Sequence, residues 1–396
     1  MHIPPIIFSQ EHKLLISCAA MHWSEKQSNV IVPQDEFEIN DRKFIELIDR
    51  HALAPLAFKC LHNNVLLTHD LKAQMKMRAE INQLAALKSM SMIVKLQKKM
   101  DELQIRGLFL KGVPLASVYY GDIGLRHCGD IDLWVEKKGF DIISSYLTSL
   151  GYRSNLELSQ FNLRQIAFKY KTDHHIHFAS EDPALPPVIE LHWKLRGRFG
   201  FFTFDPENPA IKYLEFDVGG VHVNILNHVD NFLFLCCHGS EHAWYRLKWL
   251  FDLPKVINHV QFNWDDVYER AIELHCLNQV KMTFLLLSRF LKIDVPSQFN
   301  IKILDRKVKS QLLYIEHCIQ YDGDYCDTSI EKAKNLLYFL SINQRGFLNF
   351  QLILRYLTSE RDWKTLQMPE KLFFLYFPLR PFLIIWRVFL GRINKK

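Results

Sequence analysis

The sequence predicts an α+β protein in which a small mixed β-sheet core lies between helical N-terminal and C-terminal regions. Three observations indicate this class. Apolar residues recur at helical spacing up to about residue 105, short runs with strand character occupy residues 106–228, and helical spacing returns from residue 229 onward. We therefore expect three regions: helices at 1–105, the core at 106–228 and further helices at 229–396.

In the first region, one long helix is predicted, with Asp70 as its N-cap. Apolar residues recur three and four apart along it: Leu84, Leu87, Met90, Ile93, Leu96, Met100 and Leu103. Gly107 follows, and the pattern then changes to that of the core.

The core begins with LFLKG at 108–112, which predicts a short buried strand entering a glycine turn, and Pro114 then suits a first helical turn. The alternating DIDLWVE at 130–136 predicts a second strand, and FDIISSYLTSLG predicts a helix that ends at Gly151. Further runs with strand character are IAFKYK, HIHFA, VIELHWKL and VHVNIL. The last region is helical, with breaks expected at Pro254, Pro296 and Pro369.

Composition limits the class of protein. Hydrophobic residues make up 48% and charged residues 23%, as in globular proteins. The net charge of +6 suits an anionic substrate but is weak evidence for nucleic acid. The 8 cysteines form no C-x-x-C pair and the N-terminus lacks a signal-peptide pattern, so we expect free thiols and a cytoplasmic location. No run approaches the ~20 apolar residues of a transmembrane helix.

Three carboxylates are the candidate catalytic and metal-binding residues. Asp130 and Asp132 are two apart on a predicted strand, so both emerge on one face. Glu190 lies on the later strand VIELHW, which could be a neighbour in the sheet. Carboxylates this close repel one another unless a cation lies between them, and hard oxygen ligands favour Mg²⁺, with Mn²⁺ as a substitute. Each carboxylate alone could instead be a solvated strand residue.

Lys111 and Gly112 are candidate nucleotide-binding residues, because they lie between a buried strand and a helix N-terminus. Gly112 would allow close approach of the backbone to a phosphate. Lys111 could contact phosphate or pair with Asp130 or Asp132. Arg126 could bind a triphosphate or orient the carboxylates, since its donor fork suits both.

The segments LFLKGVPLASVYYGDIGLRHCGDIDLWV and VIELHWKL resemble the family of uncharacterised nucleotidyltransferases within the DNA-polymerase-beta-like superfamily. By this resemblance, Asp130 and Asp132 match the metal-binding pair, Glu190 the third carboxylate and Gly112 the phosphate-loop glycine. The wider superfamily usually has Gly-Ser or Gly-Gly where this chain has Lys-Gly. The resemblance implies an Mg²⁺-dependent enzyme that moves a nucleoside monophosphate from an NTP, such as ATP, by a two-metal mechanism.

Histidines supply further candidate residues. His192 should share a face with Glu190 and could contact substrate, orient Glu190 or be structural. The segment CCHGSEHAWYRLKWLFDLP is predicted to be one helix, on which polar and aromatic residues form a stripe that could line a substrate cleft or be half buried: His238, His242, Tyr245, Trp249 and Asp252. A zinc site at His238 and His242 lacks an evident third ligand. The run HHIH at 174–177 could suggest metal, but a polar strand edge is favoured.

The acceptor is not identified by the sequence, although a small molecule, sugar, peptide or protein is favoured over nucleic acid. Two other functions stay open: a catalytically inactive nucleotide-binding or interaction module, and a metal-dependent phosphohydrolase that uses His238, His242 and Asp252. The basic, aromatic C-terminus could lie on a membrane surface through Arg380, Arg387, Arg392, Lys395 and Lys396. A helix packed on the protein with a solvated basic tail is favoured.

Overall fold

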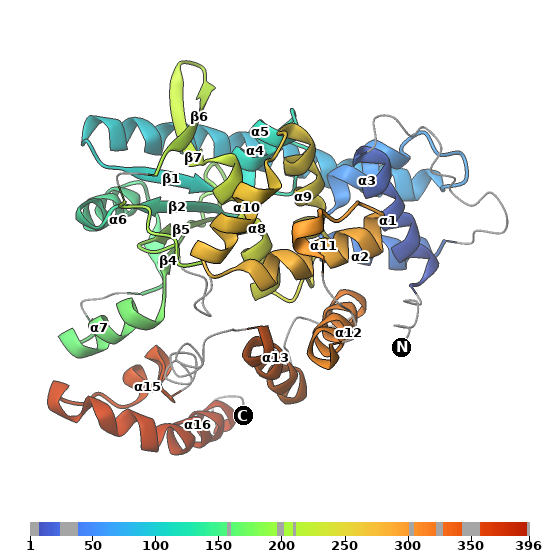
Figure 1. Cartoon of the computed structure of the whole chain (residues 1–396). Helices are drawn as coiled ribbons and strands as arrows, with labels where there is room; N and C mark the ends of the chain where they lie inside the picture. The colour runs from blue at the N-terminus through green and yellow to red at the C-terminus, as the bar shows by residue number, and fades with distance from the viewer. Residues whose placement is uncertain are drawn as a thin grey trace.

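The computed structural model describes residues 8–23, 39–156, 160–195, 202–208, 211–300, 305–321, 328–342 and 357–393. Along the chain, helices precede and follow the strands of a small sheet, which confirms the predicted α+β class (Figure 1). Within the described helices, no segment is both long and apolar enough to cross a bilayer.

The N-terminal region consists of α1 (Gln10–Trp23), α2 (Asp41–Arg50), α3 (Ala54–Leu61) and the long α4 (His69–Glu102). Thr68, rather than Asp70, caps α4, because its hydroxyl accepts a hydrogen bond from the Leu71 amide. Ile93, Leu96 and Met100 are buried on α4 as their spacing suggests, whereas Leu84 and Leu87 are exposed. The apolar stripe therefore faces the protein only along the second half of the expected run.

Five strands form the main sheet in the order β1-β2-β5-β4-β3. Their bounds are Gly107–Leu110 (β1), Ile131–Val135 (β2), Arg153–Ser154 (β3), His175–Ala179 (β4) and Val188–His192 (β5). β2 and β5 are parallel, while β1 with β2, β4 with β5 and β3 with β4 are antiparallel. A hairpin of β6 (Tyr213–Val218) and β7 (Val221–Leu226) lies beside β1 and α4 (Figure 1).

Short helices connect these strands: α5 (Gly112–Tyr119), α6 (Phe140–Ser149) and α7 (Leu163–Thr172). The expectation of a strand at IAFKYK is wrong, because this run lies within α7. Asn162 and Gln165 form a reciprocal capping box at its N-terminus, and this local hydrogen bonding begins a helix where alternation of apolar residues predicted a strand.

The C-terminal region contains α8 (His228–Glu241), α9 (Leu247–His259), α10 (Trp264–Glu273), α11 (Leu277–Leu291), α12 (Arg306–Gln320) and α13 (Ser329–Ile342). Buried residues of these helices share one apolar cluster with the N-terminal helices, for example Phe44 with Phe232 and Phe284. A second cluster joins α4 and α6 to the sheet. The N-terminal helices and α8 to α13 thus pack together at one end of the molecule.

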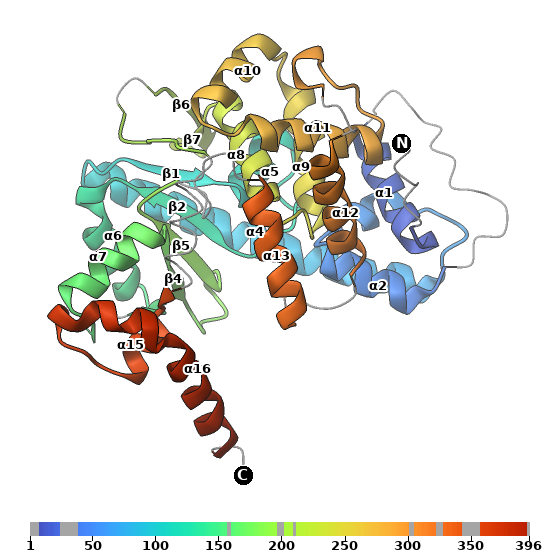
Figure 2. The same ribbon diagram turned by 60° about the horizontal axis from the view of Figure 1, so that its bottom comes forward.

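The last described segment forms α15 (Glu360–Thr365), a 3₁₀ turn and α16 (Tyr376–Ile393). These elements pack on α7 through a small third cluster, and α16 extends away from the sheet (Figure 2). Two of the basic residues considered for a membrane surface, Arg380 and Arg387, contact the buried Asp362, as the favoured alternative of a packed helix suggests. Lys395, Lys396 and the side chain of Arg392 lie outside the described residues.

Candidate active site

Strand register brings the predicted carboxylates onto one face of the sheet. Asp132 on β2 lies directly opposite Glu190 on the parallel strand β5, and Asp130 immediately precedes β2. All three line one cavity of about 260 Å³. One oxygen each of Asp132 and Glu190 and a nitrogen of His192 lie within 4.8 Å of one another. Glu190 is therefore beside the Asp pair, not on the opposite face.

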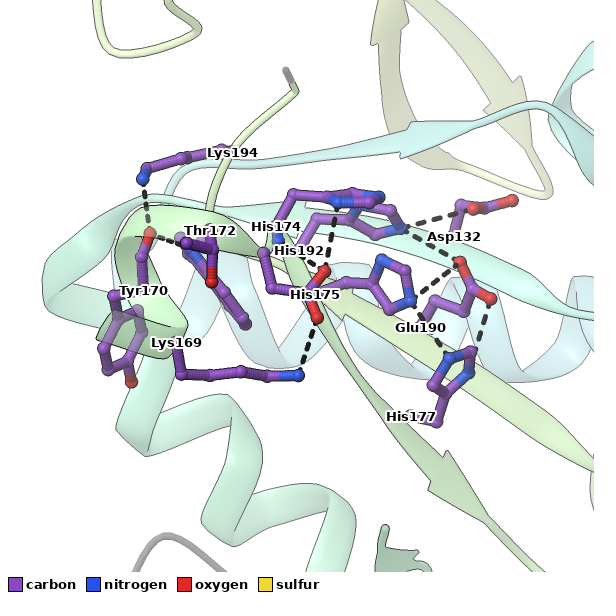
Figure 3. Close-up of polar contacts among 12 residues, drawn as sticks. Asp132, Lys169, Tyr170, Thr172, His174, His175, His177, Glu190, His192 and Lys194 are labelled. Carbon is purple, nitrogen blue, oxygen red and sulfur yellow. Dashed lines mark hydrogen bonds and ion pairs between the residues drawn. The ribbon is translucent and has the colours of Figure 1, made fainter. Parts of the chain in front are cut away.

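The side chains of Lys111 and His192 contact these carboxylates. Lys111 Nζ lies 2.9 Å from Asp132 Oδ1, and His192 Nε2 lies 3.2 Å from the same oxygen and 3.4 Å from Glu190 Oε2 (Figure 3 draws the His192 contacts). Asp132 is only 1% exposed. Such a buried carboxylate needs a cation or hydrogen-bond donors beside it, and Lys111 and His192 provide them.

The pKa values follow from this arrangement. Burial opposes ionisation of Asp132, but the charge of Lys111 and a hydrogen bond from His192 outweigh it, so the pKa of Asp132 is lowered. Burial likewise opposes protonation of His192, yet its hydrogen bonds to Asp132 and Glu190 raise its pKa. In contrast, burial and the nearby charge of Asp132 raise the pKa of Asp130. Asp130 is thus the strongest base among the two aspartates.

Lys111 and Gly112 form a tight turn between β1 and α5. Both have positive φ, 48° for Lys111 and 49° for Gly112, and Gly112 is the first residue of the helix. A non-glycine residue in this region is strained by about 1–3 kcal/mol. The turn directs the Lys111 ammonium toward Asp132 and leaves Gly112 at the cavity surface. The N-terminus of α5 therefore opens onto the same cavity as the carboxylates.

Arg126 lines the cavity, and its guanidinium is hydrogen-bonded to Asp252, which does not line the cavity. Its Nε and Nη2 donate to the two oxygens of Asp252 at 2.8 and 2.9 Å, and the Tyr120 hydroxyl donates to the same carboxylate at 2.7 Å. Asp252 is fully buried behind Arg126. Asp252 is thus placed to support the cavity wall through Arg126, and the structure does not bring it together with His238 and His242.

The expected single helix from residue 236 to 252 is wrong, because α8 ends at Glu241 and α9 begins at Leu247. Ala243 and Trp244 have φ of 46° and 54°, which reverses the chain between the two helices. The Trp244 ring packs against Gly239, where a Cβ would lie only 2.2 Å from the ring. Glycine at 239 is therefore required for this reversal.

Despite the break, four of the five stripe residues line the cavity: His238, His242, Tyr245 and Trp249. The His242 ring lies 4.7 Å from that of His238 and 4.8 Å from that of Trp249, measured between ring centroids. Among the described residues, none of the groups with metal-ligand spacing includes His238 or His242. This wall is therefore aromatic and imidazole-rich, opposite the carboxylates.

Sequence reasoning missed three lysine and arginine residues of the cavity: Lys194, just after β5, and Arg246 and Lys248 at the start of α9. Burial, followed by the charge of Arg126, lowers the pKa of Lys248 to about 8. With Lys111 and Arg126, these side chains surround the carboxylates with positive charge. The segment WYRLKW contains both Arg246 and Lys248 between aromatic residues, but its sequence does not show which basic side chain faces the cavity.

The fold and the carboxylate face define an α+β protein with an acidic site enclosed by cationic side chains. Residues 38–292 match the family described as uncharacterised nucleotidyltransferase, more than half of the chain, and the protein belongs to that family. A search of curated proteins gives no match. Among solved structures, the chain is similar to an antigenic nucleotidyltransferase-like protein from Paracoccidioides brasiliensis, with 14% identity, a TM-score of 0.32, and coverage of 52% of this chain and 92% of that one.

Proposed function

We propose that the protein transfers a nucleoside monophosphate from an NTP to an acceptor hydroxyl or phosphate and releases pyrophosphate. The observation that carries this proposal is the convergence of Asp130, Asp132 and Glu190 on one sheet face, beside the turn at Gly112. Family membership supports a general nucleotidyltransferase role. The NTP donor and the two-metal mechanism are part of the proposal.

The donor set fits Mg²⁺, with Mn²⁺ as a substitute. All three predicted ligands are carboxylates, and a cation already contacts Asp132 through the Lys111 ammonium. When bound, Mg²⁺ would supply positive charge to the acceptor oxygen and to the leaving pyrophosphate. Asp130, Asp132 and Glu190 would hold it, and the Lys111 ammonium would then be released from Asp132 to contact a phosphate.

The remaining residues bind and orient the substrates. The α5 N-terminus, Arg246 and Lys248 face the cavity with positive charge and would position the triphosphate. Arg126 would either bind the triphosphate together with these groups or support the cavity wall through its contact with Asp252. Glu190, or a carboxylate beside it such as Asp130, would take the acceptor proton. His238 and His242, next to Trp249, would contact the base or the acceptor.

A second function has one observation in its favour. The Lys111 ammonium contacts Asp132, and His192 contacts both Asp132 and Glu190. A protein that only binds nucleotide, or another partner, could use these contacts to hold the carboxylates in place. Binding of NTP without transfer of label would support this non-catalytic function.

The test is incubation of the full chain with each α-labelled NTP, Mg²⁺ and a cell extract, followed by tracing of the label. Asp132→Asn keeps the shape of the side chain but removes its charge, so we expect transfer to fall at least about 100-fold. Asp266→Asn, an exposed change on α10, is the control. If the folded Asp132→Asn protein transfers label at the parent rate, the mechanism is wrong.

A further inference from the structure

Glu190 has neighbours of two different kinds on its two sides. On β2 it faces Asp132, and on β4 it faces His177, since the register pairs it with both residues. His175 lies two residues before His177 and therefore on the same sheet face. Figure 3 shows both imidazoles directed at the Glu190 carboxylate, on the side away from Asp132. An acidic site and a histidine site thus meet at one residue.

The distances in the histidine site are those of potential metal ligands. His175 Nε2 lies 3.0 Å from His177 Nε2 and 3.9 Å from Glu190 Oε2, while His177 Nδ1 lies 3.3 Å from Glu190 Oε1. One ligand atom of each residue falls within 4.8 Å of the others. The three distances involve both ring nitrogens of His177 and both oxygens of Glu190, and each is comparable to the spacing of about 3.3 Å between ligand atoms in a tetrahedral site with bonds of about 2.0–2.1 Å.

The burial of the three side chains also suits an ion. His175 is 6% exposed and Glu190 17%, so packing restricts their movement, whereas His177 is 40% exposed and opens the site to solvent. Imidazole nitrogen with one carboxylate favours Zn²⁺ and related transition metals over Mg²⁺, which prefers oxygen ligands. Three protein ligands leave a fourth position for water or substrate.

We propose that His175, His177 and Glu190 bind a divalent transition-metal ion of the Zn²⁺ class. This site is distinct from the oxygen site at Asp130 and Asp132, and it shares only Glu190 with that site. An ion held by the histidines draws Glu190 away from Mg²⁺, so Zn²⁺ weakens the binding of Mg²⁺ with NTP. This last consequence rests on the proposed function, whereas the site itself does not.

The site is tested by titrating the metal-free full chain with Co²⁺, followed by visible absorption, and with Zn²⁺, followed by calorimetry, both without nucleotide. We expect one ion per chain and at least tenfold weaker binding in His177→Ala. His222→Ala, an exposed histidine on β7, should bind as the parent does. His177→Gln is a second variant of closer size, and thermal melting checks the fold of each.

Equal affinity in the parent and in both folded His177 variants would overturn the site, since the ion would then lie elsewhere, for example between Asp132 and His192. The competition is measured separately, as the affinity for NTP with Mg²⁺ when Zn²⁺ is added. Unchanged NTP affinity in the Zn²⁺-loaded chain would overturn the competition and leave the site intact. A chain that transfers no label at all would contradict the proposed function without affecting the Co²⁺ result.

Discussion

Lys248 is a single buried lysine whose charge faces the candidate site. Its ammonium faces the cavity at the start of α9, near Asp130 but also near Arg126 and Arg246. Burial lowers its pKa from an ordinary 10.5 to about 8, which corresponds to at most about 3 kcal/mol of lost stability. An anionic triphosphate at this position would relieve the cost.

We predict that Lys248→Met raises the free energy of unfolding by about 1–3 kcal/mol at pH 7 and weakens NTP binding at least tenfold. The native pKa is below the unfolded one, so the unfolded chain binds more protons between about pH 8 and 10.5, and parent stability rises with pH there. The advantage of the variant should therefore shrink above pH 8. Urea unfolding across pH measures this.

Lys98→Met, an exposed change on α4, is the control for that experiment. A Lys248→Met protein that is no more stable than the parent at pH 7 would contradict the argument from burial. The same protein with unchanged NTP affinity would exclude Lys248 from the binding site.

At the scale of elements, the Arg126–Asp252 pair joins the segment before β2 to α9. Both side chains are at least 95% buried, and their two hydrogen bonds form a bidentate contact. The Tyr120 hydroxyl adds a third donor to Asp252 from the end of α5. Three segments that surround the cavity are therefore held by one carboxylate.

We predict that Asp252→Ala lowers the free energy of unfolding by about 3–5 kcal/mol, because it leaves Arg126 charged and buried without a partner. Chemical denaturation measures the loss. The double variant Arg126→Met with Asp252→Leu removes both charges and should recover most of the stability. If Asp252→Ala is as stable as the parent, the pair does not support the wall, and a role for Asp252 in binding becomes the better interpretation.

The same scale shows what the sequence could predict. Strands β1, β2 and β5 were predicted because they are short, apolar and next to glycine or charged turns. The helix α7 was mistaken for a strand, because Ile166, Phe168 and Tyr170 alternate. Phe168 packs against Trp363 and Phe373, which lie about 200 residues later in the chain, and local alternation cannot reveal such a contact.

For the candidate site, too, the residues that depend on local spacing could be predicted, and those that depend on distant packing could not. The carboxylates could be predicted, because spacing on a strand determines which side chains share a face. Arg246 and Lys248 could not, since the reversal at Ala243 and Trp244 depends on the packing of Trp244 against Gly239. Asp252 has the right position for a cleft residue on an uninterrupted helix, but the break turns it toward Arg126.

At the scale of the whole molecule, the apolar interior is divided unevenly. Two large clusters hold the helices and the sheet, while α15 and α16 form a small third one around Trp363 and Tyr376. Arg380 and Arg387 of α16 both contact Asp362 of α15, whose side chain is fully buried. Asp362 therefore joins α16 to α15 through two ion pairs.

We predict that Asp362→Asn speeds amide hydrogen exchange in α15 and α16 at least tenfold, equivalent to about 1.4 kcal/mol, because both arginines lose their counter-charge. Exchange in β2 and β5 should not change. Mass-spectrometric hydrogen exchange measures both, with the exposed Glu370→Gln as control. Faster exchange in the sheet as well would show that the third cluster is part of one cooperative unit.

Because β2 pairs with β5 in parallel, the candidate site can form only late during synthesis of the chain. Asp132 and Glu190 belong to strands separated by α6, β3, α7 and β4, and parallel strands cannot be joined by a tight turn. Contacts between distant parts of a chain form late, because closing the loop costs entropy first. During synthesis, we therefore expect Asp130 and Asp132 to stay hydrated and apart from Glu190 until β5 has left the ribosome. A nascent chain that ends before Glu190 would lack the third carboxylate of the proposed Mg²⁺ site, so we expect an incomplete product to bind NTP with Mg²⁺ more weakly than the full chain does.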